Sequence, residues 1–86
     1  MERVIEVLAM EEYRLLLTFS NGEIRIFDVK PYLNDKFWAP LSKVEEFQQV
    51  KVAGRSVEWP LSMDFCTDEI YQKSMPIGRR LSASGF

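Results

Sequence analysis

The chain has 86 residues, a hydrophobic content of 47% and a net charge of −2 from 11 basic and 13 acidic residues. This length and composition fit one small globular domain and exclude a disordered or fibrous chain, and the near-balanced charge gives no reason to expect nucleic acid. Because the chain has no histidine and a single cysteine, Cys66, it excludes a disulfide framework, a Cys/His zinc site and a nucleophile activated by histidine.

Three β-strands are predicted over residues 4–8, 13–19 and 24–28. The second segment alternates between two faces, which is the period of a strand. Its apolar face carries Tyr13, Leu15, Leu17 and Phe19. Asn21-Gly22 predicts a tight type I′ hairpin turn, which needs positive φ at both central residues. Short connections make the three strands an antiparallel meander.

This turn sets the expected register of the third strand. Ile24 and Ile26 are expected to join the apolar face of the second strand. Arg14 and Arg25 are then expected on the outer face, next to Glu23, as a solvated cross-strand group of charges.

The segment after the meander is predicted to leave the sheet. Pro31 favours a short helical turn, followed by a loop over residues 34–39. Ser42 and Glu45 match a capping box and predict a short helix over residues 42–49.

The last third of the domain is predicted to hold a hairpin and a helix. Residues 50–52 and 56–59 alternate and indicate a second short β-hairpin. Thr67 is a good N-cap for a short C-terminal helix, which Met75-Pro76 ends.

The predicted fold class is therefore α+β. It combines an antiparallel β-meander of three strands, a short helix, a second short β-hairpin and a short C-terminal helix. Residues 1–76 are expected to form this single domain, and residues 77–86 are expected to form a small, polar and basic C-terminal tail outside the core.

The N-terminal segment does not have the pattern of a signal peptide, because Glu6, Glu11 and Glu12 interrupt its apolar residues. No apolar run approaches the roughly 18 residues that span a bilayer. We therefore expect a cytoplasmic protein with no membrane partner.

Several short motifs follow one another along these elements. They are Leu17-Thr18-Phe19, Asn21-Gly22-Glu23, Phe27-Asp28-Val29, Pro31-Tyr32-Leu33, Leu41, Phe47, Val57-Glu58-Trp59-Pro60, Asp64-Phe65 and Thr67-Asp68-Glu69-Ile70-Tyr71. Their order and spacing resemble a small bacterial family, domain of unknown function 2442, over roughly Val4 to Tyr71. The resemblance implies an α+β domain with a β-meander and no defined activity. It also implies, from members that lie beside another small protein, an antitoxin-like half of a two-protein system.

Acidic residues are the first candidate site. Asp28, Asp64 and Asp68, with Glu58, could form a carboxylate cluster that binds a divalent cation or acts as general acid and base. The alternative is structural: Asp28 bonds backbone amides at a strand end, Asp68 stabilises a first helical turn and Glu58 faces solvent.

Large aromatic residues are the second candidate site, as partner-binding residues. Trp59 could anchor an interface or close the core, and in the core its indole N–H is expected to reach Asp64. Phe37 and Trp38 lie together in the predicted loop. They form either a lid over the sheet or an exposed contact patch, and the patch is the best candidate for a partner surface.

Cys66 precedes the C-terminal helix, where a thiol can be acidified. It has no histidine partner, and the neighbouring carboxylates oppose a thiolate. We expect an inert thiol in the core.

Two classes of function remain. The first is a non-enzymatic protein-interaction module that pairs with itself or with a small partner protein, without a cofactor and without nucleic acid. An antitoxin-like regulatory protein is one form of it. The second is a carboxylate-based metal-binding protein or small enzyme, which needs at least three of the acidic residues in one pocket.

Overall fold

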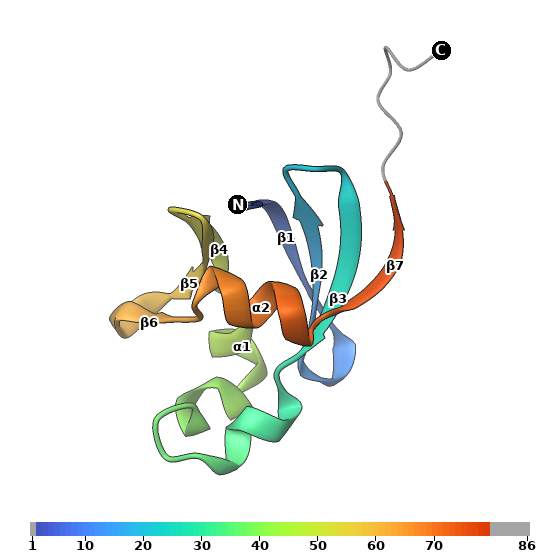
Figure 1. Cartoon of the computed structure of the whole chain (residues 1–86). Coiled ribbons are helices and arrows are strands. Elements are labelled where there is room, and N and C mark those ends of the chain that lie inside the picture. The colour runs from blue at the N-terminus through green and yellow to red at the C-terminus, as the bar shows by residue number, and fades with distance from the viewer. Residues whose placement is uncertain (1, 80–86) are drawn as a thin grey trace.

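The computed structural model describes residues 2–79, which fold into two antiparallel sheets flanked by short helices (Figure 1). The first sheet has the strand order β1-β2-β3-β7 and the second has the order β4-β5-β6. The strands are β1 (Val4–Met10), β2 (Arg14–Phe19), β3 (Glu23–Asp28), β4 (Lys51–Ala53), β5 (Ser56–Trp59), β6 (Met63–Asp64) and β7 (Met75–Arg79). The helices are α1 (Val44–Phe47) and α2 (Thr67–Lys73), with 3-10 turns η1 (Glu11–Tyr13), η2 (Lys30–Asn34), η3 (Ala39–Ser42) and η4 (Pro60–Ser62).

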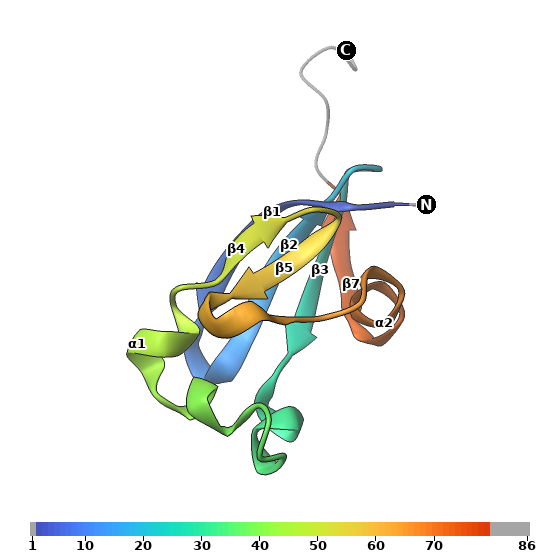
Figure 2. The same ribbon diagram turned by 90° about the vertical axis from the view of Figure 1, so that its left-hand side faces the viewer.

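The hydrophobic core lies between the two sheets. Figure 2 shows β4 and β5 in front of the four-stranded sheet, with α1 at one end and α2 at the other side. The core combines strand residues with residues from the connecting segments. It contains Val4, Leu15, Leu17, Phe19, Phe27, Val29, Leu41, Phe47, Val57, Trp59, Met63, Phe65 and Ile70. The predicted α+β class and the meander β1-β2-β3 are confirmed.

The turn between β2 and β3 differs from the predicted type I′ turn. The loop has three residues, Ser20 to Gly22, because Thr18 pairs with Ile24. The Gly22 N–H donates to the Phe19 carbonyl at 2.9 Å, and Gly22 alone of the three has positive φ, 90°. A three-residue loop that ends in a left-handed glycine is the next commonest hairpin connection.

This extra loop residue reverses the predicted faces of β3. Arg25 pairs with Leu17 and Phe27 pairs with Leu15, so both lie on the core face, and Phe27 is 1% exposed. Ile24 and Ile26 lie on the outer face instead. A shift of one residue moves every side chain of a strand to the other face. The expectation of a solvated Arg25 is therefore wrong, since Arg25 is only 9% exposed.

The boundary predicted after Pro76 falls inside a strand. β7 pairs antiparallel with β3, from Met75 opposite Ile26 to Arg79 opposite Glu23, and forms one edge of the four-stranded sheet. Residues 77–79 are thus part of the fold. The rest of the predicted tail, residues 80–86, lies outside the described residues.

The first helix is shorter than predicted and lacks the capping box. It begins at Val44, and the Ser42 hydroxyl donates to the Ala39 carbonyl at 2.7 Å within η3. Val44 is 51% exposed, whereas Phe47 is 2% exposed and packs in the core. The second helix is present as predicted, but it begins at Thr67, the residue predicted to be its N-cap, and its N-cap is Cys66.

Candidate functional site

The outer face of the four-stranded sheet carries apolar side chains that no described element covers. Both α-helices and the second sheet lie on the opposite side (Figure 1). The pairings Leu8 with Leu16, Leu16 with Ile26, and Ile26 with Met75 form one line across all four strands. We call these four residues the apolar row. An antiparallel sheet with one solvated face normally has polar residues there, so an apolar row is a candidate contact surface.

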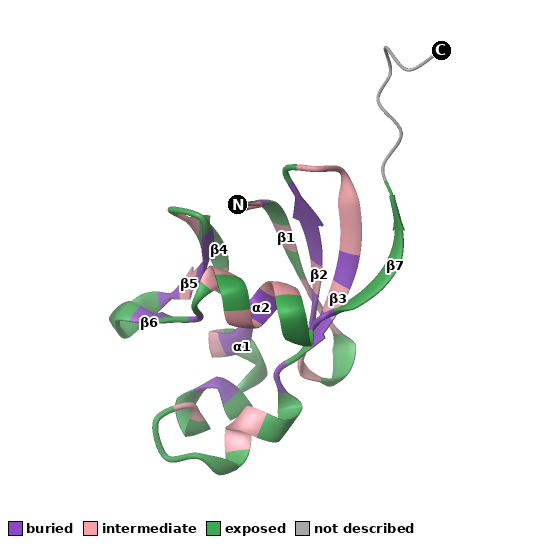
Figure 3. Cartoon of the chain, viewed as in Figure 1, coloured by how far each residue is buried: buried purple, intermediate pink, exposed green. Residues whose placement is uncertain are grey.

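Exposure is greatest at the two ends of the apolar row. Leu8 on β1 is 61% exposed and Met75 on β7 is 68% exposed, while Leu16 and Ile26 on the inner strands are half-buried. Figure 3 shows the same gradient, with the edge strand β7 exposed along its length and β2 mostly buried. With strands about 4.8 Å apart, the row is about 14 Å long, which suits the contact of a partner's strand or helix.

Rows that contain charged residues flank the apolar row on both sides. On one side Glu6 pairs with Thr18, which pairs with Ile24, and on the other side Met10 pairs with Arg14, which pairs with Asp28. An apolar centre with a charged rim of both signs is the usual composition of a protein–protein contact.

A groove runs along β1, the other edge strand of this sheet. It has a volume of about 530 Å³. Its lining comes from both faces of β1, from the outer faces of β2 and β3, and from the first part of β4 with the residue before it. These residues are Glu6, Val7, Leu8, Leu16, Thr18, Ile24, Val50, Lys51 and Val52. The groove therefore connects Leu8 and Leu16 of the apolar row with β4 of the second sheet.

The aromatic candidates divide between core and surface. Trp59 is fully buried, and its indole N–H donates to the Phe47 carbonyl at 2.9 Å, so it is not a surface anchor and does not bond Asp64. Trp38 is half-buried and stacks on Phe65 with ring centroids 4.2 Å apart, as a lid on the core. Phe37 is 56% exposed.

The acidic candidates do not converge. Asp28 accepts a hydrogen bond from the Lys30 backbone N–H at 3.0 Å, the structural role weighed for it. Asp64 lies opposite Glu58 in the pair of β5 and β6, and Asp68 lies in the first turn of α2. Across residues 2–79, no three acidic or cysteine side chains are grouped so that they could hold a metal ion.

Cys66 is exposed at the start of α2, so the expectation of a core thiol is wrong. Its neighbour Phe65 takes the buried position instead, at 5% exposure.

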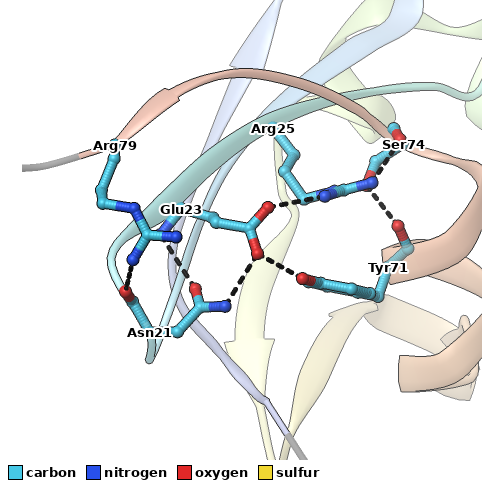
Figure 4. Close-up of polar contacts among 6 residues, drawn as sticks. All are labelled: Asn21, Glu23, Arg25, Tyr71, Ser74 and Arg79. Atoms are coloured by element: carbon cyan, nitrogen blue, oxygen red, sulfur yellow. Dashed lines mark hydrogen bonds and ion pairs between the residues drawn. The ribbon is translucent and has the colours of Figure 1, made fainter.

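A buried polar network joins β3, α2 and β7 (Figure 4). The Arg25 guanidinium donates to the Ser74 hydroxyl at 2.7 Å, to the Ser74 carbonyl at 2.8 Å and to Glu23 at 2.7 Å. It also lies 4.3 Å from the centroid of the Tyr71 ring, whose hydroxyl donates to Glu23. Arg79 donates to the Asn21 carbonyl at 2.9 Å. Because Ser74 immediately precedes β7, this network holds the strand that carries Met75.

The network shifts the titration of two of its members. The hydrogen bond from Tyr71, with further bonds from Asn21 and Arg25, lowers the pKa of the Glu23 carboxyl. The same bond to Glu23, together with burial, raises the pKa of Tyr71. Both shifts favour a charged carboxylate and a neutral phenol in the folded state. The network thus stabilises the fold at neutral pH and loses this contribution as the pH falls through the folded pKa of Glu23.

A second phenol–carboxylate pair predicts the response to high pH. Burial raises the pKa of Tyr32 to about 12, and its hydrogen bond to Glu69 at 2.9 Å adds to the shift. The unfolded chain titrates near the ordinary value of 10.0, so it loses this proton first as the pH rises. We expect the free energy of unfolding to fall between pH 10 and pH 12, and Tyr32→Phe to flatten this fall.

Urea unfolding at the two limits of that interval, for the wild type and Tyr32→Phe, measures the difference. Tyr71 acts in the same direction, so part of the fall remains in the variant. An equally steep fall in both proteins would contradict the role assigned to Tyr32.

The sequence contained one signal of the apolar row, since Leu16 makes the second face of β2 only partly polar. The positions of Ile26 and Met75 in the row depend on the register of β3 and on β7, and these were not predicted.

Within residues 2–79, no helix is both long and apolar enough to cross a membrane. Neither the curated proteins nor the solved structures include a match to this chain. The sequence model of a family described as a protein of unknown function, DUF2442, matches residues 4–76. The match begins at the first residue of β1 and ends within β7, so it includes the entire core and the meander that bears the apolar row. The chain belongs to the DUF2442 family.

Proposed function

We propose that this chain is a non-enzymatic protein-interaction module of the cytoplasm, which binds a small partner protein through the apolar row. The observation that supports the proposal is the alignment of Leu8, Leu16, Ile26 and Met75 across the uncovered face of the sheet. Water contact with such a row is unfavourable, at about 25 cal/mol for each Å² of apolar surface. A partner that covers the row gains this free energy.

The rest of the described surface supports a binding role over a reaction. The predicted carboxylates are separate, and the strongest polar cluster, around Arg25 and Glu23, is engaged in internal hydrogen bonds. A pairing with one small protein, as in an antitoxin-like two-protein system, is one form of this binding role.

Met75→Lys tests the proposal, because Met75 is 68% exposed and its replacement adds a charge to the apolar row without opening the core. We expect the variant to fold with an unchanged Tm and to bind its partner at least about tenfold more weakly. The measurement is affinity capture from native extracts, followed by titration of the captured protein with each variant.

Leu61→Lys is the matched control. Leu61 is 83% exposed in η4, so the same change of charge is made at an exposed leucine outside the row. Its φ of 71° is already positive in the wild type. If wild type, Met75→Lys and Leu61→Lys all bind the captured partner with equal affinity, the apolar row is not the contact surface.

A further inference from the structure

The groove of about 530 Å³ extends across the outer face of the sheet as far as the strand next to β7. Its lining includes Leu8, Leu16 and Ile24, one residue from each of β1, β2 and β3. The residue of β7 opposite Ile24 is Gly78. A Cβ atom at Gly78 would have no atom within 4 Å beyond its chain neighbours. The outer face of β7 is therefore open at the point where the groove meets it.

The chain continues after β7 with a segment that starts beside this opening. Arg79, the last residue of β7, is held at the end of the sheet, because its guanidinium donates to the Asn21 carbonyl at 2.9 Å. Residues 80–86 follow, with the sequence Arg-Leu-Ser-Ala-Ser-Gly-Phe. The segment thus offers two large apolar side chains, Leu81 and Phe86, joined by small residues that permit close approach to a sheet.

The segment is long enough to reach the far end of the groove. From β7 to β1 there are three strand spacings, about 14 Å, and from Arg79 to the apolar row there are three residues along β3, about 10 Å. The diagonal from Arg79 to Leu8 is therefore about 17 Å. Residues 80–86 span about 23 Å when extended. Phe86 can thus reach Leu8.

We propose that residues 80–86 fold back across β7 and occupy the groove, with Leu81 against Ile24 and Phe86 against Leu8. Leu8 is 61% exposed, and both contacts remove apolar surface from water. Because the segment belongs to the same chain, its effective concentration at the groove is about millimolar. A contact that is too weak to hold a separate peptide is then well populated.

The occupied groove regulates the proposed function, on which this inference rests. Leu8 and Leu16 belong to the apolar row, so a partner that binds the row must first displace Phe86. A binding surface that is free in only part of the population has a lower apparent affinity. Removal of residues 80–86 is therefore expected to strengthen the binding of a captured partner several-fold.

Paramagnetic relaxation tests the location of the segment in the full-length chain. In a Cys66→Ser background, Ser84→Cys carries a nitroxide label, and methyl signals are compared before and after reduction of the label. We expect strong broadening at Leu8 and Ile24, and weak broadening at Leu61 in η4. The measurement is repeated after tenfold dilution, where a contact within one chain is unchanged.

The matched control is the same labelled chain with Leu81→Ser and Phe86→Ser, in which we expect the broadening at the groove to be lost. A second arm uses the apolar dye anilinonaphthalene sulfonate. A chain that ends at Arg79 retains all of β7, and we expect it to bind the dye several-fold more tightly than the full-length chain. Leu8→Lys in the shortened chain should remove this gain, and circular dichroism verifies that each variant is folded.

Four outcomes would each overturn the inference. They are an absence of broadening at the groove, broadening that the double serine variant retains, broadening that dilution removes, and equal dye binding by the two chain lengths. The proposed function is tested separately. If the groove is not covered and Met75→Lys still weakens the binding of a captured partner, the covering segment is wrong and the partner surface stands. If the groove is covered and Met75→Lys changes nothing, the covering segment stands and the proposed function is wrong.

Discussion

We expect Trp59→Ala to lower the free energy of unfolding by about 3–5 kcal/mol, the usual cost of removing a large aromatic side chain from a core. Trp59 is fully buried, and its ring centroid lies 6.0 Å from those of Phe47 and Trp38 and 5.9 Å from that of Phe65. A domain of this size has a total stability of only about 4–13 kcal/mol. The substitution therefore removes a large fraction of the stability of the domain.

Urea unfolding followed by circular dichroism measures this loss. A second variant, Trp59→Phe, retains most of the ring but removes the N–H that donates to the Phe47 carbonyl at 2.9 Å. It should cost about 1–3 kcal/mol, because a buried carbonyl loses its partner.

Trp38→Ala is the matched control for Trp59→Ala. Trp38 stacks on Phe65, but it is half-buried and lies at the outside of the core. It should therefore cost clearly less than the same change at Trp59. A greater loss at Trp38 than at Trp59 would contradict the arrangement in which Trp38 covers a core that Trp59 fills.

The sequence predicted the strands of the meander well and predicted their faces poorly. Alternation along β2 is a local property, and Leu15, Leu17 and Phe19 are buried as predicted. The face of β3 depends on the number of loop residues, and both a two-residue and a three-residue loop suit Asn21-Gly22. That difference of one residue buries Arg25 and Phe27 and turns Ile24 and Ile26 outward.

The apolar row was not predicted, for two reasons. The first is the register of β3, which turns Ile26 to the outer face. The second is that the Met75 end of the row lies on β7, and Pro76 and Gly78 gave this segment the composition of a loop. β7 is a strand because Arg25 and Ser74 anchor its start and β3 offers a free edge. Such long-range contacts leave no periodic signal in the segment itself. The acceptor for Trp59 was missed likewise, since a backbone carbonyl of a distant helix carries no sequence signature.

We expect Arg25→Ala to have the second-largest effect, a loss of about 2–3 kcal/mol in the free energy of unfolding, since hydrogen bonds from a charged donor are lost in a buried site. Its guanidinium makes three hydrogen bonds, of 2.7, 2.8 and 2.7 Å, with Ser74 and Glu23. Without it, the Ser74 carbonyl loses this donor and Glu23 loses its counter-ion. The loss should also free β7 locally, which hydrogen exchange of the β7 amides measures beside global unfolding.

Arg14→Ala is the control, because Arg14 and Arg25 are both arginines of the hairpin of β2 and β3, and the sequence alone does not distinguish them. Arg14 lies on the outer face, 41% exposed at its side chain, and its ion pair with Glu12 has a distance of 3.7 Å. Exposed pairs of this kind contribute about 0–1 kcal/mol. If the two alanine variants were equally stable, the buried network would not hold β7. If only Arg25→Ala accelerates hydrogen exchange in β7, then Arg25 holds this strand and keeps Met75 in the apolar row. The register of β3, which places Arg25 on the core face, then decides which of the two arginines supports the fold.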